Sequence, residues 1–201
     1  MLLLLCLPTV LAAQNGPAVK LEDFKLTQVL RGNPQLLSEL KGKVVVLTTL
    51  SITDVKGHEI APPLDDTSES RREYARNKYM AQQQAEKNFL KAKNFTREFN
   101  RFYLRYEDSA SVLCIGLLGQ WAPSGEFLKP KPMTPEIAEE HAKAIGFKAP
   151  ILKTEMVPGT VMDATQDWVM VFNAAGDRIY NGPADSKADK AVRDVLKELA
   201  P

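Results

Sequence analysis

Few of the side chains that usually carry covalent or metal chemistry are present in this sequence. The 201 residues include two cysteines and two histidines. His58 stands beside Glu59 and near Asp65 and Asp66, but a solvated acidic loop explains this group more simply than a cation site does. His141 is expected to be an exposed residue of a charged helix. No phosphate loop, nucleophile elbow or dinucleotide fingerprint occurs, so the sequence predicts no metal site and no cofactor.

An excess of charge of either sign is also absent. Lysine and arginine together number 26, and aspartate and glutamate 25. This balance argues against a protein that binds nucleic acid or a membrane surface over a whole face. The length fits one ordinary domain with some decoration. We therefore expect no nucleic acid as a partner; the local charge of the helix over 69–106 favours a protein partner instead.

The sequence has no long hydrophobic run, and its most apolar segment is short. Residues 1–13 read MLLLLCLPTVLAA and end in small residues, which is typical of a secretory signal peptide. We therefore predict an exported protein, periplasmic or secreted. The run is too short to span a bilayer as a stable anchor. A buried N-terminal strand or helix is the alternative.

Cysteine is so scarce that removal of the signal would leave Cys114 alone. One thiol cannot form an internal disulfide. Cys114 lies in residues 111–118, a continuous apolar run typical of a buried parallel strand. The sequence therefore predicts a buried, inert thiol, with a reactive thiol as the alternative.

The elements that are present alternate between strands and helices. Valine-rich residues 43–49 predict a core strand, and apolar residues spaced three or four apart predict a long helix over 69–106. Thr134 followed by Pro135 predicts a helix start, with an end near Gly146. Residues 149–153 suggest a strand, 167–182 a strand, turn and strand, and 185–199 a closing helix.

The segment Leu40–Leu47, LKGKVVVL, resembles the start of the first core strand in the redoxin, TlpA/ResA-like branch of the thioredoxin superfamily. The lead-in before it and the ending over 167–182 resemble the same family. The resemblance implies an α/β fold with a thioredoxin-like central mixed sheet flanked by helices over residues 20–200. Compared with the family, the chain has an N-terminal extension and a long helical insertion, 57–88, after the first core strand.

The resemblance also shows what the chain lacks. The two cysteines of a TlpA-like site would fall at Asp54 and Gly57, and the family's cis-proline would fall near Asp167. Because a thiolate is the nucleophile in disulfide exchange, these positions cannot perform it. The peroxiredoxin cysteine motif is missing as well. Asp54 could act as an acid or base near a helix N-terminus, but a helix-capping role explains it more simply.

The predicted long helix carries a local excess of positive charge. Between Arg71 and Arg105 there are ten lysines and arginines against three glutamates. Four of them recur every four residues and form one basic stripe, namely Lys93, Arg97, Arg101 and Arg105. The stripe is either a docking face for an acidic partner or a solvated helix face balanced by acidic surface elsewhere.

Two functions therefore remain open. The first is an exported thioredoxin-like protein that has lost dithiol chemistry and binds a partner or ligand; a structural or assembly role would rest on the same residues. The alternative is a thiol-disulfide oxidoreductase or peroxiredoxin-like antioxidant enzyme that works through Cys114 or the thiols of a partner.

Overall fold

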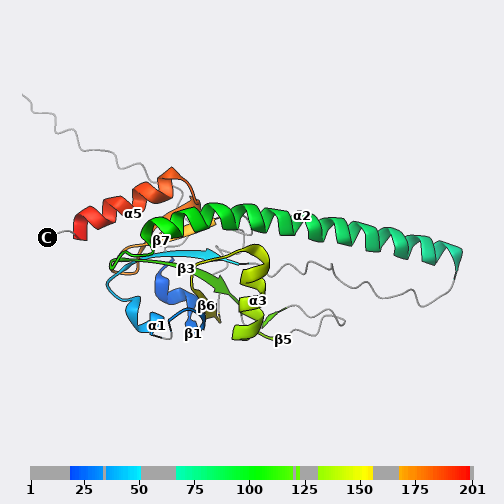
Figure 1. Ribbon diagram of the computed structural model, residues 1–201, viewed down its shortest axis with the longest axis horizontal. Helices are drawn as coiled ribbons and strands as arrows, with labels where there is room; N and C mark the ends of the chain where they lie inside the picture. Colours follow the sequence, from blue (N-terminus) through cyan, green and yellow to red (C-terminus); the bar gives the residue numbers. More distant parts are fainter. Residues whose placement is uncertain are drawn as a thin grey trace, which may run out of the picture.

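The structure is a computed structural model that describes residues 19–33, 35–50, 67–119, 121–122, 131–155 and 168–199. In this part of the chain a six-stranded mixed sheet lies between helices (Figure 1). Its strands are β1 (Leu26–Arg31), β2 (Val44–Thr49), β3 (Val112–Leu118), β6 (Ile151–Thr154), β7 (Trp168–Phe172) and β8 (Arg178–Pro183). The helices are the 3-10 helix η1 (Leu21–Phe24), α1 (Leu36–Glu39), α2 (Ser68–Tyr106), α3 (Pro135–Ile145) and α5 (Ser186–Leu199). A separate short ribbon pairs β4 (Trp121–Ala122) with β5 (Lys131–Pro132).

The order of strands in the sheet is β1-β6-β3-β2-β7-β8. β2 and β3 are parallel and are connected through α2, and β6 is parallel to β3. β7 and β8 form an antiparallel hairpin beside β2 and are followed by α5. This is a thioredoxin-like α/β arrangement with a long helix after β2, so the predicted fold class is confirmed.

The two central strands are apolar because both of their faces are covered. Val44, Val45, Val46 and Leu47 are all fully buried in β2, as expected for a strand inside a parallel unit. Val46 lies opposite Cys114 of β3 in the parallel register. The predicted strand at 111–118 and the burial of its thiol are therefore confirmed.

Successive residues of β2 contribute to two different cores. Val44 and Val46 pack into the core under α2, α3 and α5, together with Phe99, while Val45 and Leu47 pack into the core under η1 and α1. Figure 1 shows α2 and α5 above the sheet and α1 below it. This alternation is the period-two pattern of a strand covered on both sides.

Helix α2 is one continuous helix of 39 residues, which at 1.5 Å per residue is about 58 Å long. Its N-cap is Thr67, whose hydroxyl accepts a hydrogen bond from the backbone N–H of Ser70 at 3.2 Å. The buried residues of α2 all lie between Phe95 and Tyr106, and the remainder extends away from the sheet (Figure 1). The predicted long helix is confirmed, and its outer turns fall within the predicted insertion.

Helix α3 corrects one expectation. Thr134 caps it and Gly146 ends it in the left-handed conformation, as predicted. His141, however, is buried, with 7% of its surface exposed. It belongs to the buried set Ala138, His141, Ala142 and Ile145, which has the i, i+3, i+4, i+7 spacing of one helix face. The prediction of an exposed histidine was wrong because it weighed the charged neighbours in sequence above this spacing.

Candidate functional site

Cys114 is the one cysteine among the described residues. It is 5% exposed and forms no disulfide there. Burial raises the pKa of its thiol to about 12, because the apolar surroundings disfavour the charged thiolate. At neutral pH the side chain is therefore protonated and shielded. It has the properties of a core residue and not those of an attacking thiol.

The vacant redox positions are predictions that lie outside the described residues. Asp54, Gly57 and Asp167 are among the residues that the structure does not describe. The strands that lead to and from them do meet, because Thr48 of β2 pairs with Val169 of β7 and its hydroxyl donates to the carbonyl of Trp168 at 3.0 Å. The fold thus brings together the end of β2 and the start of β7, the two strand ends that border these positions in sequence.

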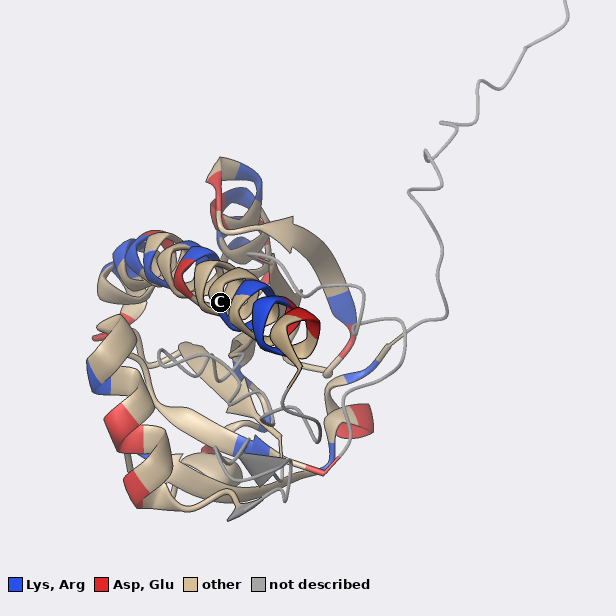
Figure 2. Ribbon diagram, turned by 90° about the vertical axis from the view of Figure 1, so that its right-hand side faces the viewer, with Lys and Arg blue, Asp and Glu red and all other residues tan. Residues whose placement is uncertain are grey.

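The basic stripe lies on α2 as predicted, with all four side chains exposed. Figure 2 shows blue segments along α2, whereas α3 carries several red ones. The structure divides the stripe into two parts. Arg105 contacts Asp189 of α5 at 2.7 Å, so it holds two helices together. Lys93, Arg97 and Arg101 lie nearer the N-terminus of α2, beside the end of α3.

Asp189 explains why Arg105 is tied to the fold. This carboxylate is buried, accepts a hydrogen bond from the Tyr106 hydroxyl at 2.6 Å and contacts Arg193 at 3.1 Å. Burial by itself raises the pKa of Asp189, but the hydrogen bonds from Tyr106 and Arg105 and the two positive charges outweigh burial and lower it. Burial and the neighbouring Asp189 carboxylate raise the pKa of Tyr106. Arg105 is therefore a structural residue.

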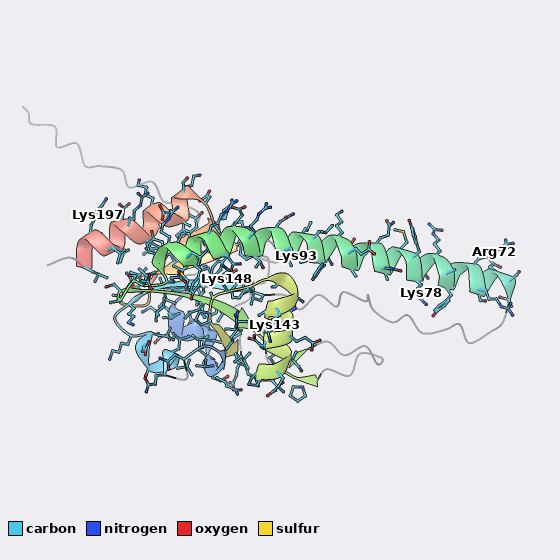
Figure 3. All side chains as sticks on the ribbon, viewed as in Figure 1. Arg72, Lys78, Lys93, Lys143, Lys148 and Lys197 are labelled. Carbon is cyan, nitrogen blue, oxygen red and sulfur yellow. The ribbon has the colours of Figure 1, made fainter. Side chains whose placement is uncertain are left out.

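The other three basic residues border a shallow groove between α2 and the connection from α3 to β6. We call it the basic groove; its volume is about 320 Å³. It is lined by Lys93, Thr96, Arg97, Asn100, Arg101, Leu104, Ile145, Gly146 and Lys148. No carboxylate is among these lining residues. In Figure 3, Lys93 on α2 and Lys148 after α3 are both labelled near this groove.

The two walls of the basic groove are firmly joined. The side chain of Asn100 donates to the carbonyl of Gly146 at 2.7 Å and accepts from the backbone N–H of Lys148 at 3.0 Å. Below this clamp the rings of Phe99 and Phe147 stack with centroids 5.4 Å apart. The groove is therefore preformed, because both walls are fixed by buried packing and by hydrogen bonds.

Charge in the basic groove is only partly balanced. Glu98 contacts Arg97 at 3.5 Å and Arg101 at 3.0 Å, and these exposed pairs are weak. The Lys93 amine lies 4.8 Å from the centre of the Phe89 ring, and neither it nor Lys148 pairs with a carboxylate of the described chain.

One buried polar group also lines the groove. Thr96 is 2% exposed, and its hydroxyl oxygen has no hydrogen-bond partner within the described residues. The groove thus offers several positive charges to an anionic group, whereas the Thr96 hydroxyl is buried beneath its surface.

Sequence analysis found three of the groove's cations and missed the fourth. Lys93, Arg97 and Arg101 follow one helical period, which a sequence shows directly. Lys148 is 47 residues beyond Arg101 and reaches the groove only because α3 ends at Gly146 and the chain turns back to β6. Asn100 was missed for the same reason, since its role depends on two backbone groups after α3.

Comparisons with known proteins give similarity of structure alone. No family profile matches the chain, and no curated protein does. Among solved structures it is similar to a thiol-disulfide isomerase from Corynebacterium glutamicum, with 15% identity, 90% of this chain and 97% of that one covered, and a TM-score of 0.47. A putative electron transfer protein from Aquifex aeolicus VF5 shows 13% identity, coverage of 90% and 98%, and a TM-score of 0.49. A thioredoxin-like superfamily protein shows 15% identity, coverage of 92% and 100%, and a TM-score of 0.48.

At this level of identity no activity passes from those proteins to this chain, and the fold class rests on the sheet topology described above. Within the described residues, no helix is long and apolar enough to cross a membrane. The same residues contain no cluster of three or more His, Cys, Asp or Glu side chains suited to a metal ion.

Proposed function

We propose that this is an exported thioredoxin-like protein that performs no dithiol exchange and binds an acidic segment of a partner protein in the basic groove. The proposed lack of dithiol exchange rests on Cys114, whose thiol is buried and has a raised pKa. Export itself is proposed from the apolar residues 1–13.

Disulfide exchange requires an accessible thiolate that attacks a sulfur atom of the substrate. Cys114 is in the middle of the sheet, and burial raises the pKa of its thiol to about 12. Asp54 and Gly57, which stand where the family's two cysteines would fall, have no thiol that could act as the nucleophile instead. A thioredoxin-like scaffold without such a nucleophile can still present surfaces to a partner, because fold does not determine function.

The basic groove supports the second part of the proposal. It combines four cations on a preformed surface, and no carboxylate is among its described lining residues. Two arginines on one helix face suit carboxylates, because a guanidinium can donate two parallel hydrogen bonds. A rigid surface of this kind loses little conformational entropy when a partner binds.

The first experiment tests the absence of redox activity. Insulin reduction and peroxide consumption should show no turnover for the wild type or for Cys114→Ala. A thiol reagent should label native Cys114 slowly and label the unfolded chain readily, since unfolding removes the burial that raises its pKa. Turnover that disappears in Cys114→Ala would establish the oxidoreductase alternative.

The second experiment tests the basic groove. The double variant Arg97→Glu/Arg101→Glu should weaken binding of a fluorescent peptide rich in Asp and Glu by at least about tenfold, which corresponds to about 1.4 kcal/mol. The matched control is Lys187→Glu/Lys190→Glu, which makes the same charge change on the exposed face of α5. Binding should also fall as salt rises, because the screening length shortens from about 10 Å at 0.1 M to about 3 Å at 1 M. Equal losses in both double variants would show that only the net charge matters and would contradict the groove.

A further inference from the structure

A second hollow lies at the opposite edge of the sheet from the point where the chain leaves β2 toward Asp54. Its volume is about 530 Å³, and its walls are η1, the start of β1, the end of α1 and the turn between β7 and β8. Lys41 lies just before β2, and Phe172, at the end of β7, pairs with Val45 near the start of β2. The hollow therefore lies at the end of the sheet where β2 begins, and it shares no lining residue with the basic groove.

The floor of this hollow is apolar. Four leucines line it, namely Leu21, Leu26, Leu37 and Leu40. Each is half-buried, because one side of it packs against the core under η1 and α1. Leucines that are half-covered and grouped around one concavity are typical of a small-molecule site, since a ligand can bury the surface that the core leaves open.

The rim of the hollow is positively charged. Lys20, Lys25 and Lys41 line it, and Glu22 is the one carboxylate among its described lining residues. Lys20 is 3.8 Å from Asp177 in an exposed and therefore weak pair. Lys25 and Lys41 form no ion pair with any carboxylate of the described chain. The charge on the rim thus suits a ligand that carries a negative group.

The walls are held in place without a ligand. The backbone N–H of Leu21 donates to the carbonyl of Gly176 at 2.9 Å, which joins η1 to the β7–β8 turn. Gly176 has a φ of 84°, a left-handed conformation that glycine adopts without strain. The carbonyl of Lys25 accepts from the N–H of Glu155 at 3.2 Å. The hollow is therefore preformed, and binding would require little rearrangement.

Lys25 has an unfavourable backbone conformation for its residue type. With a φ of 43° it is the one residue other than glycine that has a positive φ in the described chain. Glycine or asparagine would adopt this conformation at lower energy. Lysine at this position lowers the stability of the fold and at the same time places a positive charge on the rim of the hollow, which is the pattern of a residue kept for binding.

We propose that this hollow binds a small amphipathic carboxylate. The alkyl or other apolar part lies on the four leucines, and the carboxylate is held by the amines of Lys25 and Lys41, with Lys20 nearby. The apolar floor selects against a small polar anion, and the lysines select against a neutral or cationic compound of the same shape. This site is independent of the proposed function, since it shares no residue with the basic groove.

The test is calorimetric titration of the full chain with sodium decanoate below its micelle concentration. We expect saturable binding of one decanoate per chain. Sodium acetate, which lacks the apolar part, and decyltrimethylammonium, which reverses the charge, should not bind at this site. Lys41→Gln should weaken decanoate binding by about tenfold, as expected for loss of one charge-assisted contact. Lys190→Gln, on the exposed face of α5, is the matched control and should bind as the wild type does.

Lys25→Gly separates a binding role from a structural one. It removes a charge from the rim and also relieves the left-handed conformation, so the variant should melt at a higher temperature while binding decanoate about tenfold more weakly. The double variant Lys25→Gly/Lys41→Gln should show no saturable binding and should remain folded. The proposal is overturned if the wild type shows no saturable binding, if decyltrimethylammonium binds as well as decanoate, or if the double variant binds decanoate with wild-type affinity.

Discussion

The two parts of helix α2 have the same secondary structure for different physical reasons. The inner part, residues 93–106, contributes Phe95, Phe99, Phe102 and Tyr106 to the core. The outer part, residues 68–92, leaves Tyr79, Met80 and Leu90 about 60% exposed. Most helical stability in proteins comes from packing an apolar face, and the outer part has little of it. It depends instead on intrinsic propensity, on the Thr67 cap and on continuity with the packed turns.

The largest effect on stability is expected for a substitution in the inner part of α2. Phe99 is fully buried and stacks on Phe147, so Phe99→Ala should lower the free energy of unfolding by about 3–5 kcal/mol. Leu90→Ala removes an apolar side chain from the outer part and should change the same quantity by less than about 0.5 kcal/mol. Urea unfolding followed by circular dichroism measures both. A large loss in Leu90→Ala would mean that the outer part is packed against something in solution.

A smaller effect is expected where the inner part meets α5. Asp189→Asn should destabilise the protein by about 1–3 kcal/mol at neutral pH, because the buried interactions with Tyr106 and Arg105 lose their charge. The pKa of Asp189 is lower in the folded protein than in the unfolded chain. Its contribution is therefore fully present above its ordinary pKa of about 4 and is lost as the pH falls through the folded-state value.

The measurement is the difference in unfolding free energy between wild type and Asp189→Asn across the acidic range. The difference should be greatest at neutral pH and should narrow in acid. Asp194→Asn is the matched control, because within the described residues Asp194 pairs only with the exposed Lys197 on the same helix. A difference of constant size down to the most acidic pH would show that the charge of Asp189 does not matter.

The smallest effect concerns the outer part alone. Ala85→Gly should destabilise those turns by about 1 kcal/mol through helix propensity, with little change in global unfolding. Hydrogen exchange should then quicken for the amides around Ala85 and remain slow around Phe99, since local opening does not require the core to unfold. Equal acceleration in both parts would show that α2 opens as one unit.

Features that depend on residues close together in the sequence could be predicted, and features that depend on contacts between distant segments could not. The helical period of α2, the Thr134 cap of α3, the valines of β2 and the apolar run around Cys114 are local patterns, and the structure contains each of them. His141 was misjudged although its spacing was local, because charged neighbours weighed more than the period. The roles of Asn100, Lys148 and the four leucines of the second hollow depend on contacts between segments far apart in sequence. No local pattern specifies those contacts, because they are set by strand order and by the packing of helices on the sheet.

The geometry of α2 also has a mechanical consequence. The helix is about 58 Å long and is held at one end by aromatic packing, the Asn100 clamp and the bonds to Asp189. It is therefore a lever fixed at its C-terminal end. A load applied near Arg72 would act through a long arm on the turns that wall the basic groove. An event at the far tip and an event at the groove would then be mechanically coupled through the helix itself.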